Sequence, residues 1–279
     1  MSRSRAFPTM HLRGRVRRLV LVLGDQLDRH AAAFADFDDK RDAVLMMEVA
    51  EESKHVPSHR QRTVLFLSAM RHFALEQRER GRRVHYVRLD ESGNTQNFDD
   101  ELRRQVARLK PETLICTHPG EWRVLKVMHR WRDELPVEMR ILPDTHFLVA
   151  AEEFESWARG RKQFVLEHFY RRQRQERGIL MTRQGKPEGG RWNFDEDNRL
   201  AFKSAPDIRR PYRPRPDDIT REVIEVVARR LPDLPGRLES FHWPVTRGEA
   251  RRALKDFIEH RLADFGPYED AMWTGETTV

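Results

Sequence analysis

Polar side chains that could hold a ligand lie at or just after the ends of two apolar runs, Leu19–Leu23 and Ala43–Val49. The polar side chains are Asp25, Gln26, Glu48 and Glu52, and the candidate site also includes Gly24, which has no side chain. If both runs are parallel strands of an open α/β sheet, these side chains share the edge where such sheets bind ligands. The glycine permits close approach of the backbone, and the others can hydrogen-bond a polar heterocycle or a ribityl chain. A tight turn followed by a helix cap would also explain these residues.

Phosphate-binding signatures are absent from the sequence. No Gly-x-Gly-x-x-Gly follows the first apolar run, and no Gly-x-x-x-x-Gly-Lys-Ser/Thr occurs anywhere. We therefore expect neither NAD nor ATP bound in the usual way, and a flat chromophore or a degenerate nucleotide site fits better. Hydrolytic chemistry has no support, because the chain has neither a Gly-x-Ser-x-Gly nor a His-Glu-x-x-His motif.

A second candidate site lies in the stretch 189–199, where two glycines precede alternating aromatic and charged residues. Its candidate nucleic-acid contacts are Arg191, Trp192, Asp195 and Arg199. Cations can contact phosphates and aromatic rings can stack on bases, so the stretch is typical of a nucleic-acid face. Asp195 would either pair with an arginine or hold a hydrated Mg²⁺ against a phosphate. Charges that simply face solvent are the alternative.

The overall charge is compatible with a polyanionic partner. The 279 residues carry a net charge of +7, and 35% of them are charged. A basic surface fits nucleic acid most simply, although a generally arginine-rich proteome would produce the same excess. No run reaches 18 apolar residues, so no membrane-spanning helix is expected.

The single cysteine, Cys116, limits the redox chemistry of the chain. One cysteine excludes an internal disulfide and cannot supply the ligands of a cysteine-bound iron–sulfur cluster. It favours a reducing compartment, and we expect a cytoplasmic protein. Cys116 lies in an apolar run and is interpreted as a small buried core residue. Trp122 is likewise interpreted as a core residue rather than as a platform for a cofactor.

Five short segments predict strands, of which the first is a purely apolar run: they are Leu19–Leu23, Ala43–Val49, His85–Leu89, Leu114–Thr117 and Glu138–Leu142. Amphipathic stretches between them predict helices, at 58–80, 99–109 and 120–135. Strands that alternate with helices indicate a doubly wound, mostly parallel, five-stranded α/β sheet of Rossmann-like type.

Four regions are expected along the chain. Residues 1–17 are predicted to be a disordered basic extension, 18–150 the α/β domain, 151–217 a connector of helices and loops, and 218–279 the start of an all-helical domain. Two apolar stripes in the last region, around Val223–Val227 and Leu254–Phe265, need cover. The folded body of the chain, a partner, or a C-terminal part missing from this sequence could supply it.

Four motifs give the chain a family resemblance. They are Leu23-Gly-Asp-Gln-Leu27, Ser68-Ala-Met-Arg-His-Phe73, Pro119-Gly-Glu-Trp-Arg123 and Gly189-Gly-Arg-Trp-Asn-Phe-Asp195. In this order they resemble the bacterial (6-4) photolyases, also called iron–sulfur bacterial cryptochromes and photolyases. The resemblance covers about residues 18–275.

The resemblance implies an antenna domain for a lumazine-type chromophore, a connector that approaches DNA, and a helical domain with FAD and a [4Fe–4S] cluster. The antenna site would use Gly24, Asp25 and Gln26, with Glu48 and Glu52 at the neighbouring strand end. Asp195 and Arg199 would lie near the DNA lesion, Asp195 with Mg²⁺. Weak, salt-sensitive DNA binding is the expected interaction of this chain.

The sequence departs from the family because it ends soon after the helical region begins. The flavin pocket and the cluster cysteines would lie beyond Val279, so we expect this chain alone not to repair DNA. In a full-length context the function would be light-driven repair of pyrimidine (6-4) photoproducts. The alternative is a non-catalytic chromophore-binding or regulatory module that pairs with a separate helical partner.

Overall fold

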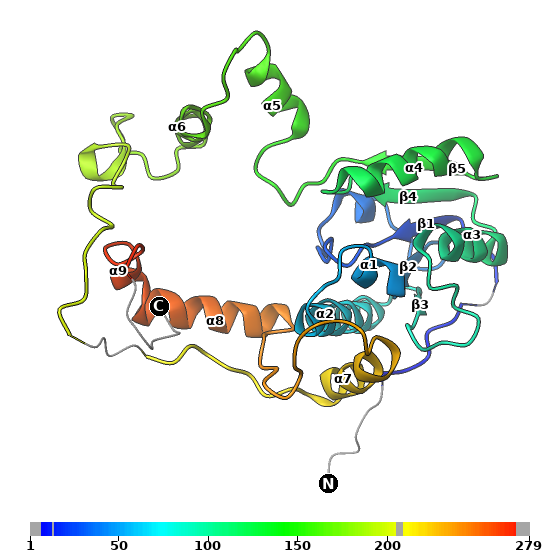
Figure 1. Ribbon diagram of the computed structural model, residues 1–279. Coiled ribbons are helices and arrows are strands. Elements are labelled where there is room, and N and C mark those ends of the chain that lie inside the picture. The colour runs from blue at the N-terminus through cyan, green and yellow to red at the C-terminus, as the bar shows by residue number, and fades with distance from the viewer. Residues whose placement is uncertain (1–6, 13, 205–208, 272–279) are drawn as a thin grey trace. The chain divides into compact units, whose positions relative to one another are not determined.

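The computed structural model describes residues 7–12, 14–204 and 209–271. Contacts divide the chain into two units, residues 1–148 with 213–250 and residues 149–212 with 251–279. Figure 1 labels their helices and strands. No helix among the described residues is both long and apolar enough to cross a membrane.

The first unit is built on a parallel five-stranded sheet. Its strands are β1 (Arg18–Leu21), β2 (Ala43–Met47), β3 (Val84–Val87), β4 (Thr113–Thr117) and β5 (Glu138–Leu142). The order is β3-β2-β1-β4-β5, and every neighbouring pair is parallel. All five strands overlap the segments that the sequence predicts as strands, and β1 to β4 are mainly apolar, as a sheet covered on both faces requires. The predicted α/β fold class is confirmed.

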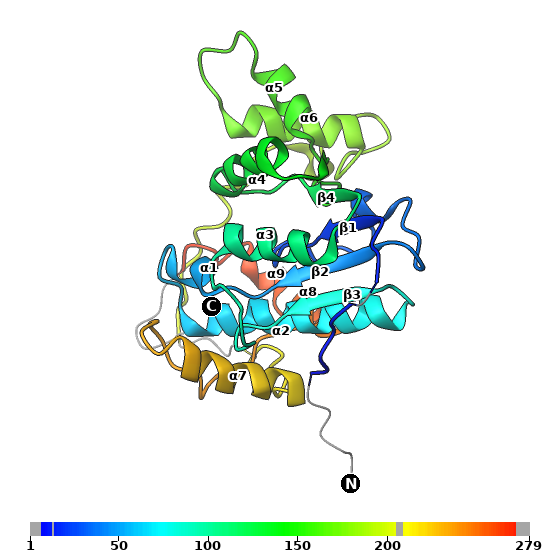
Figure 2. The ribbon, with the colours of Figure 1, turned by 90° about the vertical axis from the view of Figure 1, so that its right-hand side faces the viewer.

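Helices cover both faces of this sheet, as Figure 2 shows. On one face lies α2 (Arg60–Glu79), which packs with Val20, Val44 and Met46. On the other lie α3 (Phe98–Leu109) and α4 (Trp122–Glu134), which pack with Leu19, Leu21 and Leu45. Successive strand residues therefore bury on opposite faces, because side chains alternate along a strand. Two shorter helices, η1 (Ala32–Phe34) and α1 (Ala50–Lys54), follow β1 and β2.

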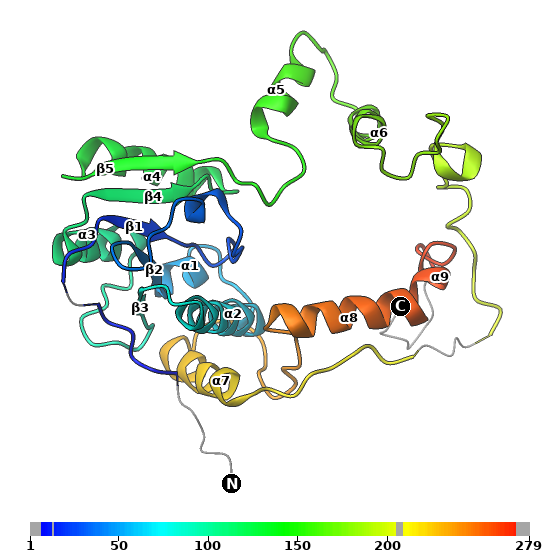
Figure 3. The same ribbon diagram turned by 180° about the vertical axis from the view of Figure 1, so that it is seen from behind.

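An additional helix, α7 (Asp218–Arg230), packs on α2 and forms an outer layer (Figures 2 and 3). Its N-cap is Asp217, whose carboxylate accepts a hydrogen bond from the backbone N–H of Thr220 at 2.9 Å. Val223, Val226 and Val227 are buried in the same core cluster as the α2 side chains. Of the three sources of cover considered for this apolar stripe, the body of the chain itself supplies it.

The described N-terminal residues also pack on this unit. Phe7 and Met10 are buried, and the Met10 carbonyl accepts a hydrogen bond from the Tyr86 N–H at 2.9 Å. The disordered extension predicted at residues 1–17 stays a prediction, and in the structure three of its apolar residues, Phe7, Met10 and Val16, reach the core. Residues 1–6 and 13 lie outside the described residues.

The second unit contains α5 (Ala151–Ala158), α6 (Leu166–Arg177), the short η2 (Glu188–Gly190) and α9 (Leu262–Phe265). Trp157 is its buried aromatic residue, and its ring lies 4.8 Å from that of Phe169. The chain near residue 200 meets the chain near residue 268, where Phe202 and Tyr268 stack at 4.6 Å.

The second apolar stripe lies on α8 (Arg247–His260) and α9. Leu254, Ile258, Leu262 and Phe265 are 47–58% exposed. The domain division at residues 150 and 217 stays a prediction, and the contacts group residues 213–250 with the α/β sheet instead.

Candidate functional site

A cavity of about 190 Å³ opens at the carboxyl ends of β1, β2 and β4. Gly24 and Asp25 follow β1, Glu48 follows β2, and Pro119 and Glu121 follow β4, and all five line the cavity. Since about 10–15 Å³ of such volume holds one water molecule, the cavity can hold a larger ligand. It lies where helices leave the sheet toward opposite faces, the position at which open α/β sheets bind ligands.

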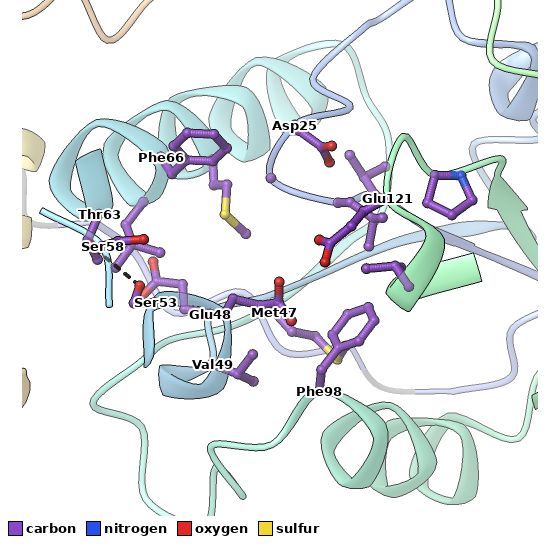
Figure 4. A pocket seen from close by; sticks show the side chains of 18 of the residues that line it. Asp25, Met47, Glu48, Val49, Ser53, Ser58, Thr63, Phe66, Phe98 and Glu121 are labelled. Carbon is purple, nitrogen blue, oxygen red and sulfur yellow. Dashed lines mark hydrogen bonds between the residues drawn. The ribbon is translucent and has the colours of Figure 1, made fainter. Parts of the chain in front are cut away.

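The cavity walls are mostly apolar, with a few hydroxyl groups (Figure 4). The apolar lining includes Met47, Val49, Phe66, Leu67, Met70, Phe98 and Val124, and the hydroxyls belong to Ser53, Ser58 and Thr63. Thr63 donates a hydrogen bond from Oγ1 to Ser53 Oγ at 3.2 Å. Apolar walls with few polar groups are typical of sites for small molecules and cofactors.

Glu48 lies at the cavity but is fully engaged with protein groups. Its carboxylate accepts hydrogen bonds from Arg71 Nε at 2.7 Å and Nη2 at 3.0 Å. It also accepts bonds from the Tyr86 hydroxyl and from the Leu89 N–H, both at 2.7 Å. Glu48 and Arg71 are both buried, so the carboxylate holds α2 to the sheet. Its role in ligand binding stays a prediction.

The Glu48–Arg71 pair extends to α7 through Glu222, which lies 3.3 Å from Arg71 Nη1 and also pairs with Arg88. Burial alone would lower the pKa of Arg71, but the charge of Glu48 and the hydrogen bonds to it raise that pKa above its ordinary value. Arg71 is therefore a permanent buried cation, which needs these carboxylates.

A second ion bridge lies at the cavity rim. Arg123 Nη2 donates to Glu52 Oε2 at 2.9 Å, and Arg123 Nε donates to Glu121 Oε1 at 2.8 Å. The hydrogen bond from Arg123 lowers the pKa of Glu121, and the bonds to both carboxylates raise the pKa of Arg123. The rim therefore carries ionised groups of both signs.

Gly24 is held close to α2. A Cβ at this position would lie 3.1 Å from Met70 Sδ and 3.3 Å from Phe66 Cδ1, so only glycine fits without a shift. The neighbouring Asp25 is exposed, and its side chain has no hydrogen bond or ion pair to any described residue. It is available for a ligand.

Gln26 is the one predicted pocket residue that does not line the cavity. Its Nε2 donates to the carbonyls of Thr117 at 3.3 Å and His118 at 3.1 Å. Gln26 thus ties the turn after β1 to the end of β4. The structure brings Gly24, Asp25, Glu48 and Glu52 together at one cavity, as the shared sheet edge predicted, while their binding roles stay predictions.

Sequence reasoning did not single out the α2 side chains of the cavity. Thr63, Phe66, Leu67 and Met70 all line it. Their spacing of three or four residues places them on one helix face, so the periodicity of 58–80 contained the signal. The interpretation of Trp122 as a core residue is wrong, since it is 67% exposed. Trp122 lies off the buried face of α4.

The stretch 189–199 has few free cations. Arg191 pairs with Asp197 and lies over the Phe194 ring at 4.4 Å. Trp192 has the guanidinium groups of Arg171 and Arg174 at 5.5 and 5.2 Å from its ring centroid. Only a subset of the predicted contacts therefore remains available for phosphates.

Of the three charged residues among the predicted nucleic-acid contacts, Asp195 and Arg199 are the two that make no ion pair within the described residues. Asp195 Oδ2 accepts a hydrogen bond from Asn193 Nδ2 at 3.1 Å and makes no ion pair within the described residues. Arg199 likewise has no ion pair there. In the described parts of the chain, no group of three or more His, Cys, Asp or Glu is arranged to hold a metal ion, and the Mg²⁺ site at Asp195 stays a prediction.

The arginines of α6 are largely paired within the protein. Arg171 pairs with Glu167, Arg172 with Glu176 and Arg177 with Glu153. Arg174 is buried and donates to the carbonyls of Ile179 and Leu180. The amino-acid composition of the sequence does not show which arginines form these ion pairs.

Comparisons with known proteins support the family resemblance of the motifs. A sequence model described as deoxyribodipyrimidine photo-lyase-related protein matches residues 20–243. A curated protein named (6-4) photolyase from Agrobacterium fabrum (strain C58 / ATCC 33970) is 43% identical over 256 residues, which cover 91% of this chain and 50% of the relative. The chain thus spans about half the length of this curated relative.

Proposed function

The chain belongs to the family of deoxyribodipyrimidine photo-lyase-related proteins, and we propose that it serves light-driven repair of pyrimidine (6-4) photoproducts in DNA. Its own part in this function is to hold a light-absorbing antenna chromophore in the sheet-edge cavity and to contact DNA through the stretch 189–199. The observation that carries the proposal is this apolar cavity with hydroxyls and a free carboxylate at its rim.

The cavity residues fit a planar, lumazine-type chromophore. Phe66 and Met70 offer an aromatic ring and a thioether on α2, and Gly24 packs against both without a side chain that would narrow the cavity. The hydroxyls of Ser53 and Thr63 can exchange their mutual hydrogen bond for bonds to polar ring atoms or a ribityl chain. Asp25, free of protein partners among the described residues, can accept a further hydrogen bond. When bound, such a chromophore would supply absorption of near-ultraviolet or blue light.

Electron transfer to the lesion would require groups that this chain does not supply by itself. FAD and a four-cysteine [4Fe–4S] cluster are expected in longer family members, whereas the present chain has a single cysteine. Cys116 is buried in β4, where burial raises the pKa of its thiol. The repair activity of the relative is thus proposed only for a protein that also contains such groups.

Binding of a ribityllumazine to the purified chain tests the antenna proposal. Phe66→Ala should weaken the affinity at least tenfold, because it removes the ring from the cavity wall, and Glu52→Ala should also weaken it. Phe147→Ala is the matched control, since Phe147 is 66% exposed and does not line the cavity. Equal affinity of the Phe66 and Phe147 variants would reject this cavity as the binding site.

DNA contact is tested by the salt dependence of binding. Arg199→Ala should lower the affinity and reduce the salt slope by about one unit if Arg199 contacts one phosphate. Arg172→Ala is the control, because Arg172 is already paired with Glu176. An unchanged slope in the Arg199 variant would remove this residue from the proposed interface.

A second candidate function is a non-catalytic chromophore-binding module that pairs with a separate helical partner. The exposed stripe Leu254, Ile258, Leu262 and Phe265 favours it, because contiguous exposed apolar surfaces mark interaction sites. Repair of a (6-4) photoproduct by the purified chain under blue light would reject this alternative. Since neither function predicts repair by the chain alone, the alternative is supported if the chain still repairs no (6-4) photoproduct when it is combined with an FAD-binding helical partner.

A further inference from the structure

The cavity rim has a charge arrangement that bears on which ligands it accepts. Glu52 follows β2 in α1, and Glu121 precedes α4 after β4, so the two carboxylates stand on opposite sides of β1. Both line the cavity. Arg123 does not line it, but reaches both carboxylates, with contacts of 2.8–3.2 Å. It is the group that joins the two sides of the rim.

The helix starts at this edge carry acidic side chains. Glu51 and Glu52 lie in the first turn of α1, and Glu121 is the N-cap residue of α4. Helix N-termini are the positions at which α/β proteins bind phosphate, because free N–H groups and the helix dipole attract anions. Here the protein places its own carboxylates at these positions, so a phosphate group on the ligand would meet negative charge.

The other charged residues at the cavity do not cancel the negative charge of these carboxylates. The charged lining residues are Asp25, Glu48, Glu52, Arg62 and Glu121. Glu48 is neutralised by Arg71, and Arg123 is shared by two carboxylates. Arg62 lies at the rim, but it donates to Ser58 Oγ at 2.8 Å and stands 5.0 Å from the Phe66 ring centroid. Four carboxylates thus face three guanidinium groups.

We propose that Arg123 is a positioning residue that sets the ligand selectivity of the cavity. By holding Glu52 and Glu121 together, it fixes the rim width and leaves a slight negative excess. The cavity then accepts an uncharged planar heterocycle with a polyol chain and excludes the phosphorylated form of the same ligand. This inference rests on the proposed chromophore site, since it names the ligand class of that cavity.

The test compares riboflavin with FMN, which differ by one terminal phosphate, and includes a ribityllumazine. Dissociation constants are measured by equilibrium dialysis for the unmodified chain and for Arg123→Gln, Arg123→Lys and Arg41→Gln. Arg41 is an exposed cation away from the cavity, so its variant controls for the change in net charge. The unmodified chain should bind riboflavin at least tenfold more tightly than FMN, and 1 M salt should reduce this preference.

Arg123→Gln should weaken riboflavin and ribityllumazine binding about tenfold and increase the discrimination against FMN, because the two carboxylates then repel each other and any phosphate. Arg123→Lys should restore part of the affinity, and Arg41→Gln should change neither ligand ratio. A merely structural role for Arg123 would lower both affinities equally and leave the riboflavin-to-FMN ratio unchanged.

If Arg123→Gln fails to fold, a double variant, Glu52→Gln with Glu121→Gln, still tests the inference. Removal of both rim carboxylates should relax the discrimination against FMN at least threefold. Equal or tighter binding of FMN by the unmodified chain, or identical ratios in the Arg123 and Arg41 variants, would overturn the inference while leaving the chromophore site intact. Failure of the unmodified chain to bind any of the three ligands would reject the chromophore site itself.

Discussion

The substitution Glu48→Gln tests whether Glu48 stabilises the fold or binds the ligand. Glu48 accepts four hydrogen bonds from protein donors, two of them from the buried Arg71. The substitution removes the charge that compensates Arg71 and replaces one carboxylate oxygen, an acceptor, with an amide nitrogen, which can only donate. We therefore expect loss of stability in the α/β unit with little change in ligand affinity.

The size of the loss follows from the remaining partners of Arg71. Removing one member of a buried ion pair costs about 3–5 kcal/mol. Glu222 still lies 3.3 Å from Arg71 Nη1, which favours the lower end, about 3 kcal/mol. For a domain of this size the midpoint of thermal unfolding then falls by roughly 10 °C.

The assay is thermal and urea unfolding followed by circular dichroism, with ribityllumazine affinity measured well below the midpoint. Glu79→Gln is the matched control, because Glu79 is exposed on the same helix as Arg71 and should change stability by less than about 0.5 kcal/mol. Glu48→Leu with Arg71→Met should be more stable than Glu48→Gln, since no uncompensated charge remains. Unchanged stability together with lost ligand binding would refute this reasoning and make Glu48 a ligand contact.

Three further predictions concern the sheet and its covering helix. Burial lowers the pKa of His85 to about 4, so His85 should bind a proton more readily in the unfolded chain; stability should fall by roughly 3 kcal/mol as the pH drops from 6.5 to 4. His85→Gln should flatten that part of a pH series of urea titrations, and an equally steep series would contradict it. Val227→Ala should cost about 2 kcal/mol, because it removes buried carbon from the contact of α7 with α2; an unchanged urea midpoint would show that α7 does not stay packed in solution. The Cys116 thiol should not react with a thiol-specific dye until the chain unfolds, since it is buried with a raised pKa; rapid labelling of the folded protein would argue against its place in β4.

Much of the fold could be predicted because its signals are local. The strands β1 to β4 are short and mainly apolar, and the helices between the strands repeat apolar residues at helical spacing. The cavity edge followed from the same prediction, because the carboxyl ends of parallel strands must share one edge. Gly24, Asp25, Glu48 and Glu52 could therefore be grouped correctly without knowledge of their contacts.

The partners of these residues could not be predicted, because they are non-local. Arg71 is one of many arginines on an amphipathic helix, and nothing in its neighbours marks it as the buried partner of Glu48. The bridge of Arg123 to Glu52 joins residues on two different helices. Sequence reasoning also placed Trp122 in the core, although the apolar face of α4 is formed by Val124, Met128 and Trp131.

The partners of the charged and aromatic residues in the stretch 189–199 could not be predicted either. Its cations and aromatic rings predicted contacts with nucleic acid, but the structure uses Arg191 to pair with Asp197 and places Trp192 beside two α6 arginines. The composition gives the number of charged residues, but it does not show which of them are neutralised by an ion pair within the protein. The separation of paired from unpaired cations, with Arg199 among the latter in the described residues, comes only from the structure.

The most direct test of the account is a crystal structure of the chain soaked with a ribityllumazine. The account predicts one planar ring system in the cavity at the carboxyl ends of β1, β2 and β4, against Phe66 and Met70, with the Glu52–Arg123–Glu121 bridge intact. A cavity filled by water alone, with the heterocycle bound elsewhere or not at all, would contradict it.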